Sequence, residues 1–227
     1  MNQWLLLDSG PGQPAHNMAL DEALLEASPR LGWPMLRFYG WTDPAATFGF
    51  SQKYLEIERL TPLRPLIRRP TGGGLVPHDT DWTYSLIIPP AHPWYDLAAV
   101  ESYRRTHEWL QAAWTRLNIA TTLALAARRV APGQCFMGAE QFDLLWQDQK
   151  IAGAAQRRTR TGLLVQGSLQ PRPDRTARTE WQQAICAVGG ERFGINWLSF
   201  TPDLPLRERA GQLASGKYTQ PAYNQRR

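Results

Sequence analysis

The sequence predicts an α+β protein, with a mixed, largely antiparallel sheet flanked by helices. Two observations support this fold class. Segments with strand-like alternation and segments with helix-like spacing follow one another without the strict strand–helix alternation of a parallel sheet. The chain of 227 residues is 43% hydrophobic and holds ten tryptophans, which is enough apolar material for a substantial core. We therefore expect a single sheet that carries helices on its faces.

Hydrophobic spacing and turn residues locate the individual elements. In chain order we expect a helix over 17–27, strands over 35–39, 47–50 and 82–88, a helix over 97–117, a hairpin of strands over 142–146 and 150–155, a strand over 163–169, and helices over 179–188 and 206–214. Asn17 is the type of residue that caps a helix N-terminus. Trp82, Tyr84 and Leu86 alternate along one face of their strand. The stripe that predicts the longest helix consists of Val100, Tyr103, His107, Leu110, Trp114 and Leu117.

Composition narrows the class of protein. No apolar run is long enough for a signal sequence or a membrane-spanning helix, so we expect a cytoplasmic protein that does not bind membranes. Two cysteines in a chain of this length do not form a disulfide framework. The net charge of +5 suits an acidic protein partner, but no nucleic-acid-binding motif accompanies it, so we expect no nucleic acid. The histidines lack metal-ligand spacing, so we expect no metal. A monomer is our default expectation.

A glycine-rich segment is the first feature that suggests a ligand. Arg68 and Arg69 precede Pro70-Thr71-Gly72-Gly73-Gly74. Adjacent glycines let a backbone approach a ligand closely and turn its amides toward an anion or a carbonyl, and the two arginines could add charge. The residues of a phosphate-binding Walker loop do not follow, and the dinucleotide fingerprint is absent. A flexible turn remains the alternative interpretation.

Three motifs in order resemble the biotin/lipoate protein ligase superfamily. They are an early Asn17-x-x-Leu20-Asp21-Glu22-Ala23, the segment from Arg69 through Thr71, Gly72, Gly73 and Gly74 to His78-Asp79, and a later Lys150-Ile151-Ala152-Gly153-Ala154-Ala155. The resemblance implies a catalytic domain related to class II aminoacyl-tRNA synthetases and biotin synthetases, spanning 1–227 with no C-terminal accessory domain. It also implies that Arg69, the glycine segment, His78 and residues 153–155 line an acyl pocket into which Lys150 points.

A cysteine separates the two chemistries of this superfamily. Ligases activate a free acid with ATP and need no cysteine, whereas the octanoyltransferases that look like ligases carry a Cys-Phe pair shortly before the lysine motif. Cys135-Phe136 stands at that place. The resemblance therefore implies transfer of octanoyl from acyl carrier protein to the lysine of a lipoyl domain, such as the glycine-cleavage H protein. A thioester on Cys135 is the expected intermediate, and no cofactor is expected.

The chemistry of the two residues fits this reaction. A free cysteine has a pKa of roughly 8.5, and a nearby ammonium favours its thiolate, which is the nucleophile. Lys150 can supply that ammonium and return a proton to the departing thiol; in its neutral form it can then act as the base for the incoming amine. Backbone amides near 72–74 or 153–155 can hold the oxyanion. Cys186, on an expected apolar helix, is interpreted as a core residue.

Two alternatives stay open at this point. One is an ATP- and magnesium-dependent ligase of lipoate or octanoate, in which Arg69, the glycine segment and Lys150 hold an acyl-adenylate. The other is a non-catalytic acyl-binding paralogue. Departures from the family pattern around Glu140 and Gln166 keep the second alternative open: residues 137–142 replace the Pro-Ser-containing run that is usual after Cys-Phe, and Gln166 stands where a histidine is usual. Two further departures are Ala154, where serine is frequent, and Pro77, where an aromatic or aliphatic residue is commoner.

Overall fold

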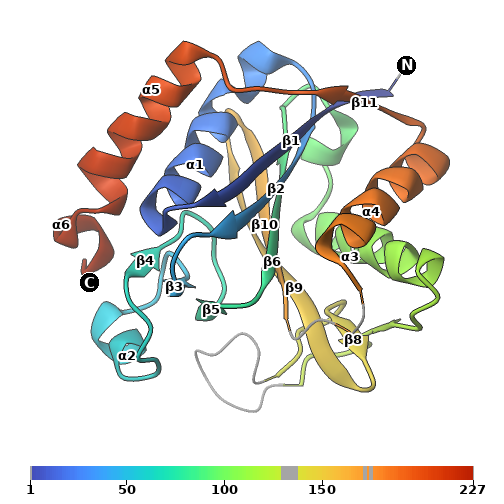
Figure 1. The fold of residues 1–227 in the computed structure, drawn as a ribbon, viewed down its shortest axis with the longest axis horizontal. Helices are drawn as coiled ribbons and strands as arrows, with labels where there is room; N and C mark the ends of the chain where they lie inside the picture. The colour runs from blue at the N-terminus through green and yellow to red at the C-terminus, as the bar shows by residue number, and fades with distance from the viewer. Residues whose placement is uncertain (1, 129–137, 171–172, 174–175, 227) are drawn as a thin grey trace.

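The structure, a computed structural model, is dominated by an eight-stranded sheet. It describes residues 2–128, 138–170, 173 and 176–226. The strands run in the order β11-β1-β2-β6-β10-β9-β8-β7 (Figure 1). β1 pairs in parallel with β11 and β2, and the other neighbouring pairs are antiparallel. The prediction of a mixed, largely antiparallel sheet is confirmed.

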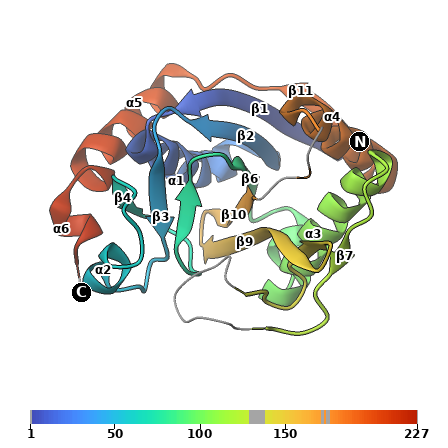
Figure 2. The ribbon, with the colours of Figure 1, turned by 60° about the horizontal axis from the view of Figure 1, so that its bottom comes forward.

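A second, smaller sheet makes the expectation of a single sheet wrong. Its three strands lie in the order β4-β3-β5, with β3 at Ala45–Phe48, β4 at Leu66–Arg68 and β5 at Val76–His78. β3 overlaps the strand expected over 47–50, but β4 and β5 were not predicted, because strands of three residues carry too little alternation to be detected. Figure 2 shows β3 and β4 beside α2, on the side of the molecule opposite α3 and α4.

Four long helices cover the two faces of the large sheet. α1 (Pro14–Leu31) and α5 (Leu204–Leu213) pack on one face, and α3 (Ala99–Arg116) and α4 (Arg178–Phe193) on the other (Figure 1). The strands of this sheet are β1 (Asn2–Gly12), β2 (Met35–Trp41), β6 (Trp82–Ile88), β7 (Thr122–Leu123), β8 (Leu144–Trp146), β9 (Gln149–Thr159), β10 (Gly162–Leu169) and β11 (Ile195–Ser199). The short helices are α2 (Tyr54–Glu58), a 3-10 turn (Pro93–Tyr95), a π turn (Ala214–Tyr218) and α6 (Pro221–Asn224).

Alternation along the central strands divides the core into two layers. On β6, Trp82, Tyr84 and Leu86 join the cluster under α3 and α4, as predicted, while Ile87 joins the cluster under α1 and α5. Such a strand is buried on both faces, and all seven residues of β6 are buried. The stripe predicted on α3 is buried at His107, Leu110 and Trp114. Val100, at its start, is 61% exposed and lies outside the core.

The first helix begins earlier than the sequence indicated. The prediction of Asn17 as its N-cap is wrong: Gln13 occupies that position and Pro14 begins the helix. Proline is favoured in a first helical turn because its fixed φ suits the helix and its missing N–H is not needed there. Asn17 is instead buried inside the helix, and its Nδ2 donates to the carbonyl of Gly40 at 2.7 Å.

The predicted hairpin of β8 and β9 places Lys150 near the start of a strand. Gln147 and Asp148 form the two-residue turn with φ values of 49° and 60°. Positive φ at both positions matches the right-handed twist of a hairpin. Phe142, the predicted start of the first strand, has a φ of 70° and lies before β8, which begins at Leu144. In the described part of the chain, we find no helix with the length and apolar character that crossing a membrane requires.

Candidate functional site

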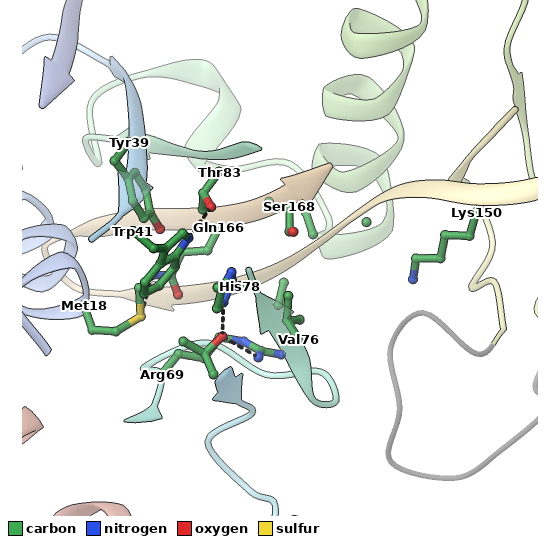
Figure 3. Close-up of a pocket in the computed structure, with 15 residues that line it drawn as sticks. Met18, Tyr39, Trp41, Arg69, Val76, His78, Thr83, Lys150, Gln166 and Ser168 are labelled. Carbon is green, nitrogen blue, oxygen red and sulfur yellow. Dashed lines mark hydrogen bonds between the residues drawn. The ribbon is translucent and has the colours of Figure 1, made fainter. Parts of the chain in front are cut away.

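A pocket lies where the small sheet meets the end of the large sheet. Its walls come from α1, from β2, β6, β9 and β10 of the large sheet, and from the segment that runs through β3 and β5. The lining residues are Met18, Tyr39, Trp41, Thr47, Arg69, Val76, His78, Thr83, Lys150, Gly153, Ala154, Ala155, Gln166, Gly167 and Ser168. Figure 3 shows Lys150 at one end, well apart from Met18, Tyr39 and Trp41 at the other.

The end of the pocket away from Lys150 is closed by side chains whose polar atoms are already bonded. Tyr39 donates its hydroxyl to Asp21 at 3.1 Å, and Gln166 donates to the same carboxylate at 2.7 Å. Asp21 in turn forms a buried ion pair with Arg37 at 2.6 Å. Because these groups satisfy one another, they leave a surface that suits an apolar chain. Burial and the Asp21 carboxylate raise the pKa of Tyr39 well above its ordinary value, so this hydroxyl stays protonated.

His78 lies in a fixed orientation on the wall of the pocket. Its ring stacks on Trp41 with centroids 3.9 Å apart. Its Nδ1 is 2.8 Å from Oδ2 of Asp81 and its Nε2 is 2.8 Å from the hydroxyl of Thr47. A carboxylate at Nδ1 selects the tautomer that carries its proton there, and Thr47 then donates to Nε2. The predicted place of His78 in the pocket agrees with this geometry.

Lys150 enters the opposite end of the pocket as half of a buried ion pair. Its Nζ is 2.8 Å from Oδ2 of Asp143, and the two side chains are 7% and 0% exposed. The backbone of Gly153 lies directly beneath: a Cβ added there would be 2.8 Å from Lys150 Nζ. The Lys-Ile-x-Gly motif therefore has a steric reason, because its glycine makes room for the end of its lysine.

The glycine segment is held by its own arginine. Nη2 of Arg69 donates to the carbonyls of Gly72 and Gly74 at 2.6 and 2.7 Å. Thr71 is fully buried and donates to Oε1 of Gln166 at 2.8 Å. Gly73 has a φ of 81°, a conformation that side chains disfavour. Arg69 lines the pocket, but Thr71 and the three glycines are outside the described lining, so their predicted contact with substrate stays a prediction.

Arg68 serves the fold and does not supply charge to a ligand, which corrects the sequence-based expectation. Its guanidinium donates to the backbone carbonyls of Phe50, Gln52, Tyr223, Asn224 and Arg226. The residue is buried, with only 1% of its surface exposed. Arg68 thus ties the C-terminal segment to the strand that precedes the glycine segment.

The two cysteines differ in what the structure describes. Cys135, the predicted nucleophile, lies outside the described residues. Cys186 is half-buried on α4 and packs against the core, and burial raises the pKa of its thiol to about 11. A thiol in that environment is a poor nucleophile, so the interpretation of Cys186 as a core residue is supported.

The sequence identified Arg69, His78, Lys150, Gly153, Ala154 and Ala155 as pocket residues, and the structure brings all six together. It missed Asp143, because the burial of this carboxylate and its contact with Lys150 appear only in the folded chain. It also missed the wall formed by Met18, Tyr39, Trp41 and Thr83, which come from separate elements. No group of three or more potential metal ligands occurs among residues 2–128, 138–170, 173 and 176–226.

The sequence of this chain is similar to the sequences of known proteins. Residues 13–188 match the family described as the lipoyl protein ligase A/B catalytic domain. The chain is 34% identical to a protein named octanoyltransferase LipM from Halalkalibacterium halodurans, over 74% of this chain and 66% of that protein. It is 33% identical to octanoyltransferase LipM of Bacillus subtilis, over 73% of this chain and 64% of the relative. The matched region thus spans just under two thirds of these relatives.

Solved structures confirm the fold. A lipoate-protein ligase A bound with ATP superposes with a TM-score of 0.80 at 20% identity, covering 99% of this chain and 98% of that one. A two-part lipoate protein ligase from Thermoplasma acidophilum, solved with its E2 lipoyl domain, gives a TM-score of 0.73 at 20% identity, covering 99% of this chain and 96% of that one. These likenesses show the fold, and the family match over residues 13–188 shows that the chain belongs to the lipoyl protein ligase A/B catalytic domain family.

Proposed function

We propose that this protein is an octanoyltransferase of lipoate biosynthesis, which moves octanoyl from acyl carrier protein to the lysine of a lipoyl domain. The relatives named octanoyltransferase support this activity. The observation that carries it is the buried Lys150–Asp143 ion pair at one end of a pocket whose far end is closed by side chains that already satisfy one another's hydrogen bonds. Such a pocket holds a medium-length acyl chain with its carbonyl beside the ammonium.

The proposed reaction proceeds in two balanced steps. The thiolate of Cys135 attacks the thioester carbonyl, the bond to the carrier sulfur breaks, and the departing thiolate takes a proton from Lys150. The neutral amine of the acceptor lysine then attacks the thioester on Cys135. The bond to the Cys135 sulfur breaks, and the proton lost by the new amide passes to Lys150. Both residues end in their starting protonation states, and no ATP is consumed.

The fold of an ATP-bound ligase makes one second function worth testing. The ligase chains with this fold are nearly fully covered by the match, so chain length does not separate them from this protein. An ATP-dependent lipoate or octanoate ligase would use free acid, ATP and magnesium. The proposed transferase uses a thioester and needs none of these. We further propose that the protein acts as a cytoplasmic monomer on its own, with neither metal nor nucleic acid, in a catalytic domain spanning 1–227.

Transfer to a lipoyl domain tests the proposal directly. Octanoyl–acyl carrier protein without ATP should give octanoylated lipoyl domain, and Cys135→Ser should abolish the product. Cys186→Ser is the matched control and should retain turnover, because that thiol is half-buried in the core. Product from free octanoate and ATP, with pyrophosphate exchange and no dependence on Cys135, would support the ligase instead. Acyl binding without either product would indicate the non-catalytic paralogue.

A further inference from the structure

We propose that Asp143 is a positioning residue that keeps Lys150 protonated and fixed at the end of the pocket. This inference rests on the proposed function, because it concerns how Lys150 performs that reaction. The proposed reaction uses Lys150 as an ammonium in one step and as a neutral base in the next, which leaves its resting form open. The ion pair assigns the ammonium.

The first support is the burial of the pair. Lys150 Nζ and Asp143 Oδ2 are 2.8 Å apart, and their side chains are 7% and 0% exposed. An ammonium removed from water loses its proton readily unless a carboxylate compensates its charge. Asp143 supplies that compensation within hydrogen-bond distance. The ion pair also fixes the direction in which the Lys150 side chain points, because Gly153 has no Cβ and leaves space for Nζ beside the carboxylate.

The second support is that Asp143 has donors besides Lys150. The backbone N–H of Glu140 donates to Oδ2 at 2.6 Å, and the hydroxyl of Tyr103 donates to Oδ1. Tyr103 in turn accepts from the N–H of Ala154, on the pocket wall, at 3.2 Å. These donors hold the carboxylate in its orientation toward Lys150 while the lysine gives its proton to a leaving thiolate. The amine then regains a proton from the acceptor lysine.

The third support comes from the titratable groups around the pair. Tyr103 and His107 face it from α3 and Tyr84 faces it from β6. Burial and the charge of Asp143 raise the pKa of both tyrosines, which therefore stay neutral. Burial lowers the pKa of His107 to about 4, so it too is neutral near pH 7. Among the described residues, the ion pair with Lys150 therefore balances the negative charge of the Asp143 carboxylate.

The experiment exploits the chain's low lysine content. Lys53, Lys150 and Lys217 are its three lysines, so protein labelled with carbon-13 at lysine Cε gives three signals, and Lys150→Arg identifies one of them. The pH titration of the Lys150 signal is followed in the full chain and in Asp143→Asn. Asp148→Asn is the matched control, since Asp148 is exposed and its φ of 60° suits asparagine.

In Asp143→Asn the Lys150 signal should titrate at least about one pH unit lower than in the parent protein, as expected when an opposite charge at this distance is removed. Asp148→Asn should leave it unchanged. The basic limb of the pH profile for acyl-enzyme formation should move down with the signal. A folded Asp143→Asn protein whose Lys150 titrates as in the parent would overturn the inference.

Two further outcomes remain decisive. If Asp143→Asn unfolds but Asp143→Asn combined with Lys150→Met folds, the unpaired ammonium caused the failure and the pair is supported. If both unfold, Asp143 serves the loop through Glu140 and Tyr103, and the inference is wrong. A parent protein that forms no acyl-enzyme would contradict the proposed function, whereas the titration would still decide the role of Asp143.

Discussion

The end of Lys150 lies over Gly153 so closely that a side chain on the glycine would displace it. A Cβ at Gly153 would be 2.8 Å from both Cε and Nζ of Lys150 and 3.0 Å from Oδ1 of Asp143. Lysine, glycine and carboxylate therefore form one steric unit. This relationship turns a sequence motif into a quantitative prediction about catalysis.

Replacing Gly153 by alanine should slow acyl-enzyme formation by about 100-fold, the scale expected when a catalytic group is displaced by about an ångström. Rapid-quench measurement of the adduct tests this. Gly211→Ala is the matched control, because a Cβ there meets nothing within 4 Å and alanine suits the helix. Equal rates for Gly153→Ala and the parent would show that the position of Lys150 is unimportant.

Gln166 connects the glycine segment to the first helix, so its loss should weaken both stability and donor binding. It accepts from Thr71 at 2.8 Å and donates to Asp21 at 2.7 Å. Gln166→Leu leaves these buried groups short of a partner and should cost about 1–3 kcal/mol in the free energy of unfolding. It should also raise KM for the acyl donor. Gln212→Leu, at an exposed site, should change stability by less than about 0.5 kcal/mol in the same urea titration.

His107 makes the stability of the fold depend on pH. Burial lowers its pKa to about 4, and its side chain is fully buried. The unfolded chain binds a proton near pH 6.5 and the folded chain binds one only near 4, so stability is complete above about 6.5 and falls as the pH decreases toward 4. The loss should approach about 3 kcal/mol.

His107→Phe removes this proton uptake and should flatten the dependence between pH 7 and pH 4.5, measured by urea unfolding. His16 and His92 have lowered pKa values through burial as well, so some dependence will remain. A parent-like slope in His107→Phe would contradict the assignment to this residue.

Asn224 should stabilise the glycine segment from the far end of the chain. Its Oδ1 accepts from the backbone N–H of Arg68 at 2.9 Å, and its Nδ2 donates to the carbonyl of Tyr218 at 2.8 Å. Asn224→Ala leaves both buried groups unpaired and should cost about 2 kcal/mol. Hydrogen exchange should accelerate at the amide of Arg68 and across 71–74. Unchanged exchange there would mean that the C-terminal segment does not support this loop.

Local signals explain which parts of the fold were predictable. The hairpin that holds Lys150 followed from the turn expected around 147–149 between two strands, and the long helix α3 followed from a stripe that includes His107 and Trp114. One strand of the small sheet, β3, overlaps a predicted strand, but the sheet itself did not follow, because its three short strands are stabilised by pairing across long stretches of chain. The cap at Asn17 was misjudged because its side chain serves tertiary contacts with Gly40 and Arg37.

Some residues of the candidate site could be predicted from the sequence and others could not. Residues within motifs, such as His78 and Lys150, were predictable because the motif carries them together. Asp143 and Trp41 were not, since each acts through a partner that only folding brings near: Lys150 in one case and His78 in the other. Gln166 was noted as a departure from the family pattern, and the structure gives it a place between Thr71 and Asp21.

Intact-protein mass spectrometry after mixing with octanoyl–acyl carrier protein, without ATP, tests the covalent mechanism most directly. The account predicts one hydroxylamine-labile octanoyl adduct that maps to Cys135, persists in Cys186→Ser and is absent from Cys135→Ser. A folded protein that transfers octanoyl to a lipoyl domain without this adduct, or one that carries the adduct on Cys186, would contradict it.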